Sequence, residues 1–479
     1  MRFDPPRITS FQPPARTLMG PGPSDVPARV LAALARPTVG HLDPAFVGMM
    51  DELKSLLRYA FQTENELTFP VSAPGSVGME TCFVNLVNPG DKVVVCINGV
   101  FGQRMAENVR RCGGVPVIVE DPWGAPVDPS KVEDTFAANP DASLFAFVHA
   151  ETSTGALSDA ATLAGIARRY GALTIMDCVT SLGGVPVLLD EWGIDAAYSG
   201  SQKCLSCTPG LSPVSFSEAA VARIRARKTP CQSWFQDLSL VLGYWSGAKR
   251  TYHHTAPVNP LYGLHESLLM LAEEGLEAAW QRHRDNHLRL RAGLEALGLR
   301  FVVREDARLP QLNTVWVPDG VDEAAARTRL LKEYGLEIGA GLGVHNHRPF
   351  VDADLAGRRL GDGLRRVVGH LDEAARVEFV AVHRDDLGLL RRRRGRHEQR
   401  RLGQPVGRLD RLGREAEGRE GLVEPAHGGR RDRLGAVEHG LDVGQVQRCG
   451  PLLGHPAGGG VVEGEVGGGT DDVLVAAHQ

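Results

Sequence analysis

The middle of the chain alternates short apolar runs with stretches of helical spacing. Apolar runs typical of buried strands are KVVVCI (from 92), VPVIVE (from 115), SLFAFVHA (from 143) and ALTIMD (from 172). Between them, FGQRMAENVRRCGG and DAATLAGIARRYG carry apolar residues at helical spacing and end near glycine. Strands separated by helices of this length predict an α/β fold with a mostly parallel sheet that is covered on both faces. Ligands of such sheets bind where the strands end.

A smaller unit is expected after that sheet. From about 266 to 297 the pattern indicates one or two long amphipathic helices, a common way of joining domains. Beyond them, LRFVVRE, NTVWVP and LEIGAG are expected as strands, and DEAAARTRLLKEYG as a helix. The sequence therefore predicts a large domain that ends near 280 and a small α+β domain over 281–343.

The composition changes abruptly after about Val344. From Val351 to Gln479 there is no Lys, Ser, Ile, Met, Tyr, Trp or Asn, and no sustained period of strand or helix. Our hypothesis is a frameshift near Gly343, which resequencing the locus would test. We expect 344–479 to be an atypical tail of low order and the small domain to be incomplete. A basic RNA-binding arm is the alternative, which the acidic residues throughout the tail disfavour.

The bulk composition excludes several classes of protein. With 479 residues, 43% hydrophobic residues and a formal net charge of -5, the chain resembles an ordinary globular protein with no electrostatic reason to bind nucleic acid or an anionic membrane. No apolar stretch of about 18 residues indicates a membrane span. The first residues lack the apolar core of a secretory signal, and the final AHQ is not a peroxisomal address, so we expect a cytoplasmic protein.

One pair of cysteines has the spacing of a metal or redox motif. Cys204 and Cys207 form CxxC, but a zinc site needs a second pair of ligands, and no CxxC or HxxxH partner is found. We therefore expect no metal, and interpret the two cysteines as small residues packed behind a buried lysine.

Two residues at predicted strand ends fit the chemistry of pyridoxal 5'-phosphate (PLP). ALTIMD ends in Asp177, and the next expected strand, IDAAYSGSQK, ends in Lys203. A PLP enzyme needs a lysine to hold the cofactor and an acid beside the pyridine nitrogen. A buried Lys203 would have a lowered pKa, which favours the neutral nucleophile. Taken singly, such an Asp is more often a helix cap and such a Lys is usually solvated.

Several motifs together resemble class V aminotransferases of the fold-type-I PLP superfamily. They are MGPGPSDVP (19–27), SAPGSVGMET (72–81), NGVFGQR (98–104), HAETSTG (149–155), DCVTSLGG (177–184), SGSQK (199–203) and TYHHT (251–255). The resemblance covers about 17–343 and is strongest to the alanine–glyoxylate (serine–pyruvate) branch. It implies that 17–280 is the PLP-binding domain, that the chain forms a homodimer, and that 1–16 is an arm that wraps the partner.

The resemblance also implies a role for individual residues. Lys203 would hold PLP as a Schiff base and shuttle the substrate proton, while Asp177 would stabilise the charge at the pyridine nitrogen. The other expected contacts are Gly75, Ser76 and Gln202 at the phosphate, Phe101 stacked on the ring where many relatives have Trp, Thr152 at the ring hydroxyl, Val179 on the other face, Tyr252 and Thr255 at the partner's phosphate, and Gly22 and Pro23 on the substrate side.

The resemblance breaks where the family has an arginine that binds the substrate carboxylate. The chain reads GAGLGVHNHRPF there, and the surroundings of Arg348 do not match the motif. HNH at 345–347 lacks the context of a nuclease. The expected reaction is transamination of L-alanine or L-serine with glyoxylate, giving glycine and pyruvate or hydroxypyruvate. The alternatives are ureidoglycine–glyoxylate transamination and a PLP-binding homologue whose activity is impaired by the missing arginine.

Overall fold

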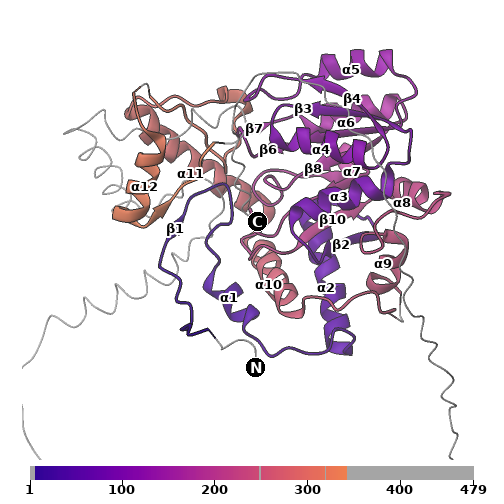
Figure 1. The fold of residues 1–479 in the computed structure, drawn as a ribbon, viewed down its shortest axis with the longest axis horizontal. Coiled ribbons are helices and arrows are strands. Elements are labelled where there is room, and N and C mark those ends of the chain that lie inside the picture. Colours follow the sequence, from indigo (N-terminus) through magenta and orange to yellow (C-terminus); the bar gives the residue numbers. More distant parts are fainter. Residues whose placement is uncertain (1–5, 248–249, 319, 342–479) are drawn as a thin grey trace, which may run out of the picture. The chain divides into compact units, whose positions relative to one another are not determined.

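The computed structural model describes residues 6–247, 250–318 and 320–341 (Figure 1). The expected tail over 344–479, with Arg348 and the HNH sequence, lies outside the described residues. No helix in the described part of the chain is both long and apolar enough to cross a bilayer.

A seven-stranded sheet with the order β2-β10-β9-β8-β5-β3-β4 forms the centre of the fold. Its strands are β2 (Leu67–Val71), β3 (Lys92–Ile97), β4 (Val115–Glu120), β5 (Leu144–Val148), β8 (Leu173–Asp177), β9 (Ala196–Tyr198) and β10 (Ser212–Phe216). Strand β10 runs antiparallel to both of its neighbours, and the other pairs are parallel. The predicted α/β fold with a mostly parallel sheet is confirmed, although β2 and β10 were not expected.

Helices cover the sheet, and the buried residues of β5 show that both of its faces are packed. Helix α3 packs against α4, and α5 packs against α6 (Figure 1). The helices of this part are α1 (Ala28–Leu34), α2 (Pro44–Phe61), α3 (Gly75–Leu86), α4 (Val100–Arg111), α5 (Pro129–Ala138), α6 (Ala160–Arg169), α7 (Leu189–Trp192), α8 (Glu218–Arg225) and α9 (Leu238–Trp245). A short antiparallel pair, β6 (Ala150–Glu151) and β7 (Ala156–Leu157), follows β5.

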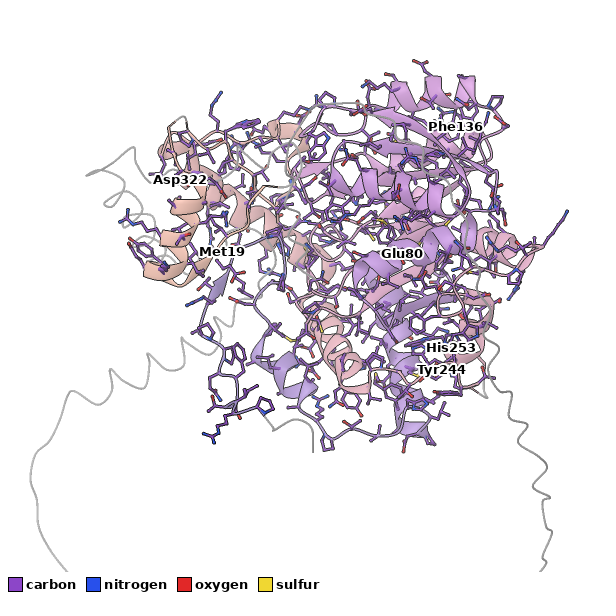
Figure 2. All side chains as sticks on the ribbon, viewed as in Figure 1. Met19, Glu80, Phe136, Tyr244, His253 and Asp322 are labelled. Carbon is purple, nitrogen blue, oxygen red and sulfur yellow. The ribbon has the colours of Figure 1, made fainter. Side chains whose placement is uncertain are left out.

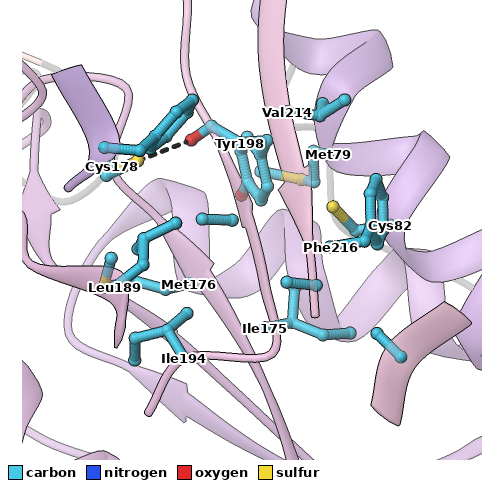
Figure 3. Packing of buried hydrophobic residues seen from close by; sticks show 14 of the residues in the cluster. Met79, Cys82, Ile175, Met176, Cys178, Leu189, Ile194, Tyr198, Val214 and Phe216 are labelled. Atoms are coloured by element: carbon cyan, nitrogen blue, oxygen red, sulfur yellow. Dashed lines mark hydrogen bonds between the residues drawn. The ribbon is translucent and has the colours of Figure 1, made fainter. Parts of the chain in front are cut away.

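The core around β8 and β9 is built from aliphatic, aromatic and sulfur-containing side chains (Figure 3). The Tyr198 ring is fully buried there, in the same cluster as Met79 and Val214. Cys178 also lies in this cluster and contacts the carbonyl of Tyr198 through its sulfur, at 3.2 Å. This packing leaves the end of β9 little freedom, and the residues that follow it therefore start from a fixed position.

The C-terminal described part differs from the prediction in its strands. The two long helices are present as α10 (Val258–Glu274) and α11 (Leu276–Ala296), separated at Gly275, and α12 (Glu323–Tyr334) follows a 3-10 turn at Glu305–Ala307. The expected strands LRFVVRE and NTVWVP are wrong: they meet in one isolated bridge between Phe301 and Val315. A pair of short segments on its own is marginally stable as a sheet, and here no ladder forms between the described residues.

The strand expected at LEIGAG is reduced to β11 (Leu336–Glu337), which pairs in parallel with β1 (Thr17–Leu18). The backbone N–H of Met19 then donates to the carbonyl of Glu337 at 2.8 Å. This pairing fixes the start of the loop MGPGPSDVP, which continues to the lysine described below.

Candidate active site

The carboxyl ends of neighbouring parallel strands bring the first candidate residues together. Asp177 ends β8, where it pairs with Val148 of β5 on one side and with Tyr198 of β9 on the other. The segments after these strands, HAETSTG, DCVTSLGG and SGSQK, therefore begin at one edge of the sheet. Such an edge is where open α/β sheets bind their ligands.

Asp177 is a buried carboxylate with a defined set of donors. One oxygen, Oδ1, accepts the backbone N–H of Val179 at 2.8 Å, and Oδ2 accepts the hydroxyl of Tyr198 at 2.7 Å. Burial raises the pKa of Asp177 to about 7, although both hydrogen bonds oppose the rise. Tyr198 was missed by the sequence reasoning, because its contact depends on the register between β8 and β9.

Lys203 does not end a strand, which corrects the prediction for IDAAYSGSQK. Strand β9 stops at Tyr198, and the polar and small residues that follow leave the ladder: Ser201 N–H donates to the carbonyl of Leu211 at 3.0 Å, and Ser206 N–H donates to that of Lys203 at 2.9 Å. Lys203 is only 9% exposed. Burial lowers the pKa of its amine to about 8, in the direction expected for a nucleophilic lysine.

The N-terminal loop packs directly on this lysine. Lys203 Nζ donates a hydrogen bond to the carbonyl of Pro21. Gly22 has a φ of 111°, and a Cβ added there would lie 2.8 Å from Lys203 Cδ and 2.9 Å from Nζ. The hydroxyl of Ser24 donates to the carbonyl of Gln202 at 3.4 Å. The structure thus places Gly22 at Lys203, whereas the neighbouring Pro23 is exposed.

The start of α3 forms a cradle beside the same loop. Gly75 is buried at the first position of this helix, which has no side-chain cap, and Ser76 is exposed. A Cβ added to Gly75 would lie 3.4 Å from the carbonyl oxygen of Ser199 and 3.5 Å from Val179 Cγ2. Uncapped N–H groups at a helix start are suited to bind a phosphate.

Gln202 points a buried amide end into this region. Its Oε1 has no hydrogen-bond partner in the described part of the chain, and a Cβ on Gly200 would lie 2.8 Å from that atom. The two ends of such an amide are assigned from their hydrogen bonds, so this one can donate to a phosphate oxygen. The orphaned amide and the uncapped helix start fit the phosphate of PLP.

Three further residues were expected around the cofactor ring. Phe101 is half-buried in the first turn of α4, and the guanidinium of Arg104 lies 4.9 Å from its ring centre. The hydroxyls of Thr152 and Thr180 are hydrogen-bonded at 2.5 Å. Val179 lies between the cradle and Asp177, with its side chain against Gly75 and its N–H on the carboxylate.

The segment TYHHT is exposed at Thr251, Tyr252 and Thr255, whereas His253 is buried. Tyr252 is 64% exposed, Thr255 is also exposed, and no hydrogen bond between described residues joins either side chain to Lys203. The neighbouring His253 stacks on the ring of Trp234 at 4.6 Å, in the same region of Figure 2 as Tyr244. His254 shares a hydrogen bond of 2.7 Å with Ser72, directly before the cradle.

The cysteines of the CxxC pair are both buried. Cys204 contacts the carbonyl of Thr180 through its sulfur at 3.4 Å, and burial raises the pKa of its thiol to about 12. Within the described ranges, no three His, Cys, Asp or Glu side chains are grouped so that they could hold a metal ion.

Comparison with known proteins decides the family. Residues 19–355 match the sequence pattern of the family described as "Aminotransferase class-V". The chain belongs to this family. It is 42% identical over 334 residues to the alanine–glyoxylate aminotransferase of Oryctolagus cuniculus, which covers 69% of this chain and 85% of the relative. It is 36% identical over 349 residues to the (S)-ureidoglycine–glyoxylate transaminase of Bacillus subtilis, covering 69% of this chain and 83% of the relative.

Solved structures agree with this assignment. The alanine–glyoxylate aminotransferase of Nostoc sp. superposes with a TM-score of 0.71 at 41% identity, over 76% of this chain and 97% of that one. The ureidoglycine–glyoxylate aminotransferase of Bacillus subtilis superposes with a TM-score of 0.70 at 34% identity, over 78% and 98%. The fold of this chain is therefore that of a class V aminotransferase, an enzyme that transfers amino groups.

Proposed function

We propose that this class V aminotransferase binds PLP and transfers the amino group of L-alanine or L-serine to glyoxylate, giving glycine and pyruvate or hydroxypyruvate. The observation that carries the proposal is a buried lysine, Lys203, beside a buried carboxylate, Asp177, with an uncapped helix start at Gly75. The substrates are suggested by relatives whose names specify alanine and glyoxylate. Among the described residues, this arrangement supplies a nucleophile, an anion and a phosphate cradle at one sheet edge.

The buried amine of Lys203 is suited to attack the cofactor carbonyl. A pKa of about 8 leaves about 9% of the amine neutral at pH 7, against about 0.03% at the ordinary value of 10.5. Burial therefore raises the fraction of Lys203 amine that is neutral, and so nucleophilic, about 300-fold at pH 7. When bound, PLP supplies an electron sink for the carbanion at the substrate Cα. Lys203 Nζ is the base that takes the proton from that carbon and the acid that returns it.

Asp177 would hold the proton on the pyridine nitrogen. A carboxylate with a pKa of about 7 is only half ionised at neutral pH. A cationic pyridinium next to it favours the charged carboxylate, because opposite charges stabilise each other strongly in a buried site. Tyr198 and the Val179 N–H keep the carboxylate in place. Phe101, Thr152 and Val179 are the proposed ring contacts, and Gly75, Ser76 and Gln202 the proposed phosphate contacts.

We propose a homodimer in which Tyr252 and Thr255 reach the partner's phosphate. Their exposure supports this, as does the exposed N-terminal arm, where Ile8 and Phe11 are 81% and 83% exposed. Mixing a Lys203→Ala chain with a Tyr252→Ala chain tests the sharing. The expected result is partial recovery of activity, because one site of each mixed dimer has both residues intact. No recovery in dimers shown to be mixed would contradict shared sites. The cytoplasmic location stays a prediction, to be tested by fractionation.

Ureidoglycine–glyoxylate transamination is the second candidate, because the Bacillus subtilis relative aligns over a similar share of the chain. Measuring glycine formed from glyoxylate with L-alanine, L-serine or ureidoglycine as the donor separates the two. We expect the largest kcat/KM with L-alanine or L-serine, and a larger value with ureidoglycine would reverse the choice. A chain that binds PLP yet forms no glycine with any donor would be the impaired homologue.

A further inference from the structure

Helix α4 carries Phe101 in its first turn but has no cap of its own. The residue before the helix is Gly99, which has no side chain that could accept a hydrogen bond from the first N–H groups. A helix start that lacks such acceptors frays unless another segment supplies them. The position of the Phe101 ring therefore depends on groups outside α4.

Ser153 supplies one of those acceptors. Its hydroxyl oxygen accepts the backbone N–H of Val100, the first residue of α4, at 3.0 Å. The same hydroxyl donates to Oε1 of Glu151 at 2.5 Å, and the N–H of Ser153 donates to that oxygen at 3.0 Å. The carboxylate thus fixes the hydroxyl that fixes the helix start.

Glu151 is fully buried, with no exposed surface. Burial raises its pKa, while the Ser153 groups and the backbone N–H groups of Gly102 and Phe101 favour the charged form. A Cβ added to Gly99 would overlap the Glu151 Cγ and Cδ atoms, so the carboxylate lies directly against the turn that enters α4. The Ser153 hydrogen bonds go to Oε1, while Oε2 is buried with no hydrogen-bond partner in the described part of the chain, so the donors compensate only in part for the lost hydration.

We propose that Glu151 is a positioning residue that sets Phe101 over the cofactor ring by holding, through Ser153, the first turn of α4. The inference rests on the proposed stacking role of Phe101. Glu151 donates nothing to the reaction, and no hydrogen bond between described residues joins it to Lys203 or Asp177. Its substitution acts on the helix start and also removes a charge that raises the pKa of Asp177, whereas Ser153→Ala acts on the helix start alone.

The chain offers a matched control for this arrangement. Asp237 is also a buried carboxylate that accepts the N–H and the hydroxyl of a serine two residues later, Ser239, at 2.9 and 2.6 Å. It caps α9, which carries none of the proposed cofactor contacts. Asp237→Asn therefore removes a similar buried cap from an unrelated helix.

The first measurement is hydrogen exchange of the peptide 98–104 in the cofactor-free, full-length chain. Ser153→Ala, which removes the acceptor of the Val100 N–H, should speed exchange of its first-turn amides by about 5- to 10-fold, the ratio for one lost capping interaction. Glu151→Gln should speed exchange by less, because the Gln side-chain oxygen can still accept from Ser153, and Ser153→Ala serves if Glu151→Gln fails to fold. Asp237→Asn should leave this peptide unchanged. Unchanged exchange in both Glu151→Gln and Ser153→Ala would overturn the inference.

The second measurement is the dissociation constant of PLP, read from the absorbance of the bound cofactor. Glu151→Gln, Ser153→Ala and Phe101→Leu should each raise it, and adding Ser153→Ala to Phe101→Leu should raise it no further, because both act on one contact. The inference would be overturned if Glu151→Gln speeds exchange but leaves the dissociation constant of PLP unchanged, while Phe101→Leu weakens binding. Glu151 would then stabilise the helix start without positioning the ring. If Phe101→Leu itself leaves the constant unchanged, the stacking role is wrong and the inference falls with it.

Discussion

Replacing the buried lysine should make the cofactor-free protein more stable. The pKa of Lys203 is about 8 instead of 10.5 because its amine is buried, with only 9% of the residue exposed. At 1.36 kcal/mol per pKa unit, keeping this amine charged at pH 7 costs about 3.4 kcal/mol of folding free energy. Lys203→Met has similar length and no charge, so it should raise the free energy of unfolding at pH 7 by up to that amount.

The pH dependence tests the physical cause. Between pH 8 and 10.5 the unfolded wild-type chain binds more protons than the folded one at this lysine, so wild-type stability falls as the pH is lowered from 10.5 to 8 and changes little further below that range. The Met variant has no such proton. Its advantage should therefore shrink by about 2 kcal/mol between pH 7 and pH 9.5.

Urea unfolding of the cofactor-free wild-type and variant proteins at several pH values measures this difference. Lys228→Met, at an exposed lysine, is the control and should change stability by less than about 0.5 kcal/mol. The reasoning is refuted if Lys203→Met is no more stable than the wild type at pH 7, or if its advantage is the same at pH 7 and pH 9.5.

Three further substitutions have defined outcomes. Gly22→Ala should lower the free energy of unfolding by about 1–2 kcal/mol because of its positive φ, and should slow PLP attachment because it displaces Lys203. Gly210→Ala is the control: its φ is 126° and no atom lies within 4 Å of the added Cβ, so it should lower stability without changing PLP attachment. Tyr198→Phe removes a donor from Asp177, so the carboxyl pKa should rise and PLP binding should need a higher pH, as a titration of affinity against pH would show. Asp177→Asn should lower kcat by about 100-fold or more in the glyoxylate assay, and a change of less than about threefold would contradict its role.

The sequence predicted the central strands because their apolar runs are buried on both faces. The five residues of β5 are all buried, and Asp177 lies at the end of β8 as expected. The loop of Lys203 was read as strand because the apolar residues before it continue into small ones. Hydrogen bonds from Ser201 and Ser206 to the backbone turn the chain there, and no periodicity along the sequence signals them.

Contacts between distant segments could not be predicted from the sequence. The Tyr198 hydroxyl reaches Asp177 only because β8 and β9 pair in one register. The Ser153 hydroxyl reaches the start of α4 across 53 positions of the chain. In the C-terminal part, LRFVVRE has the apolar pattern of a strand, but Phe301 forms an isolated bridge with Val315 and no ladder forms between the described residues.

Chemical trapping of the cofactor on its lysine tests the central claim most directly. The full-length protein is incubated with PLP, reduced with borohydride and analysed by peptide mass spectrometry, with and without prior addition of L-alanine. We predict a pyridoxyl group on Lys203, none on a Lys203→Arg protein, and a loss of the label when L-alanine is added first. A label on another lysine, or no label in a folded protein, would contradict the assignment of Lys203. A label on Lys203 that L-alanine, L-serine and ureidoglycine all leave in place would contradict the proposed transamination.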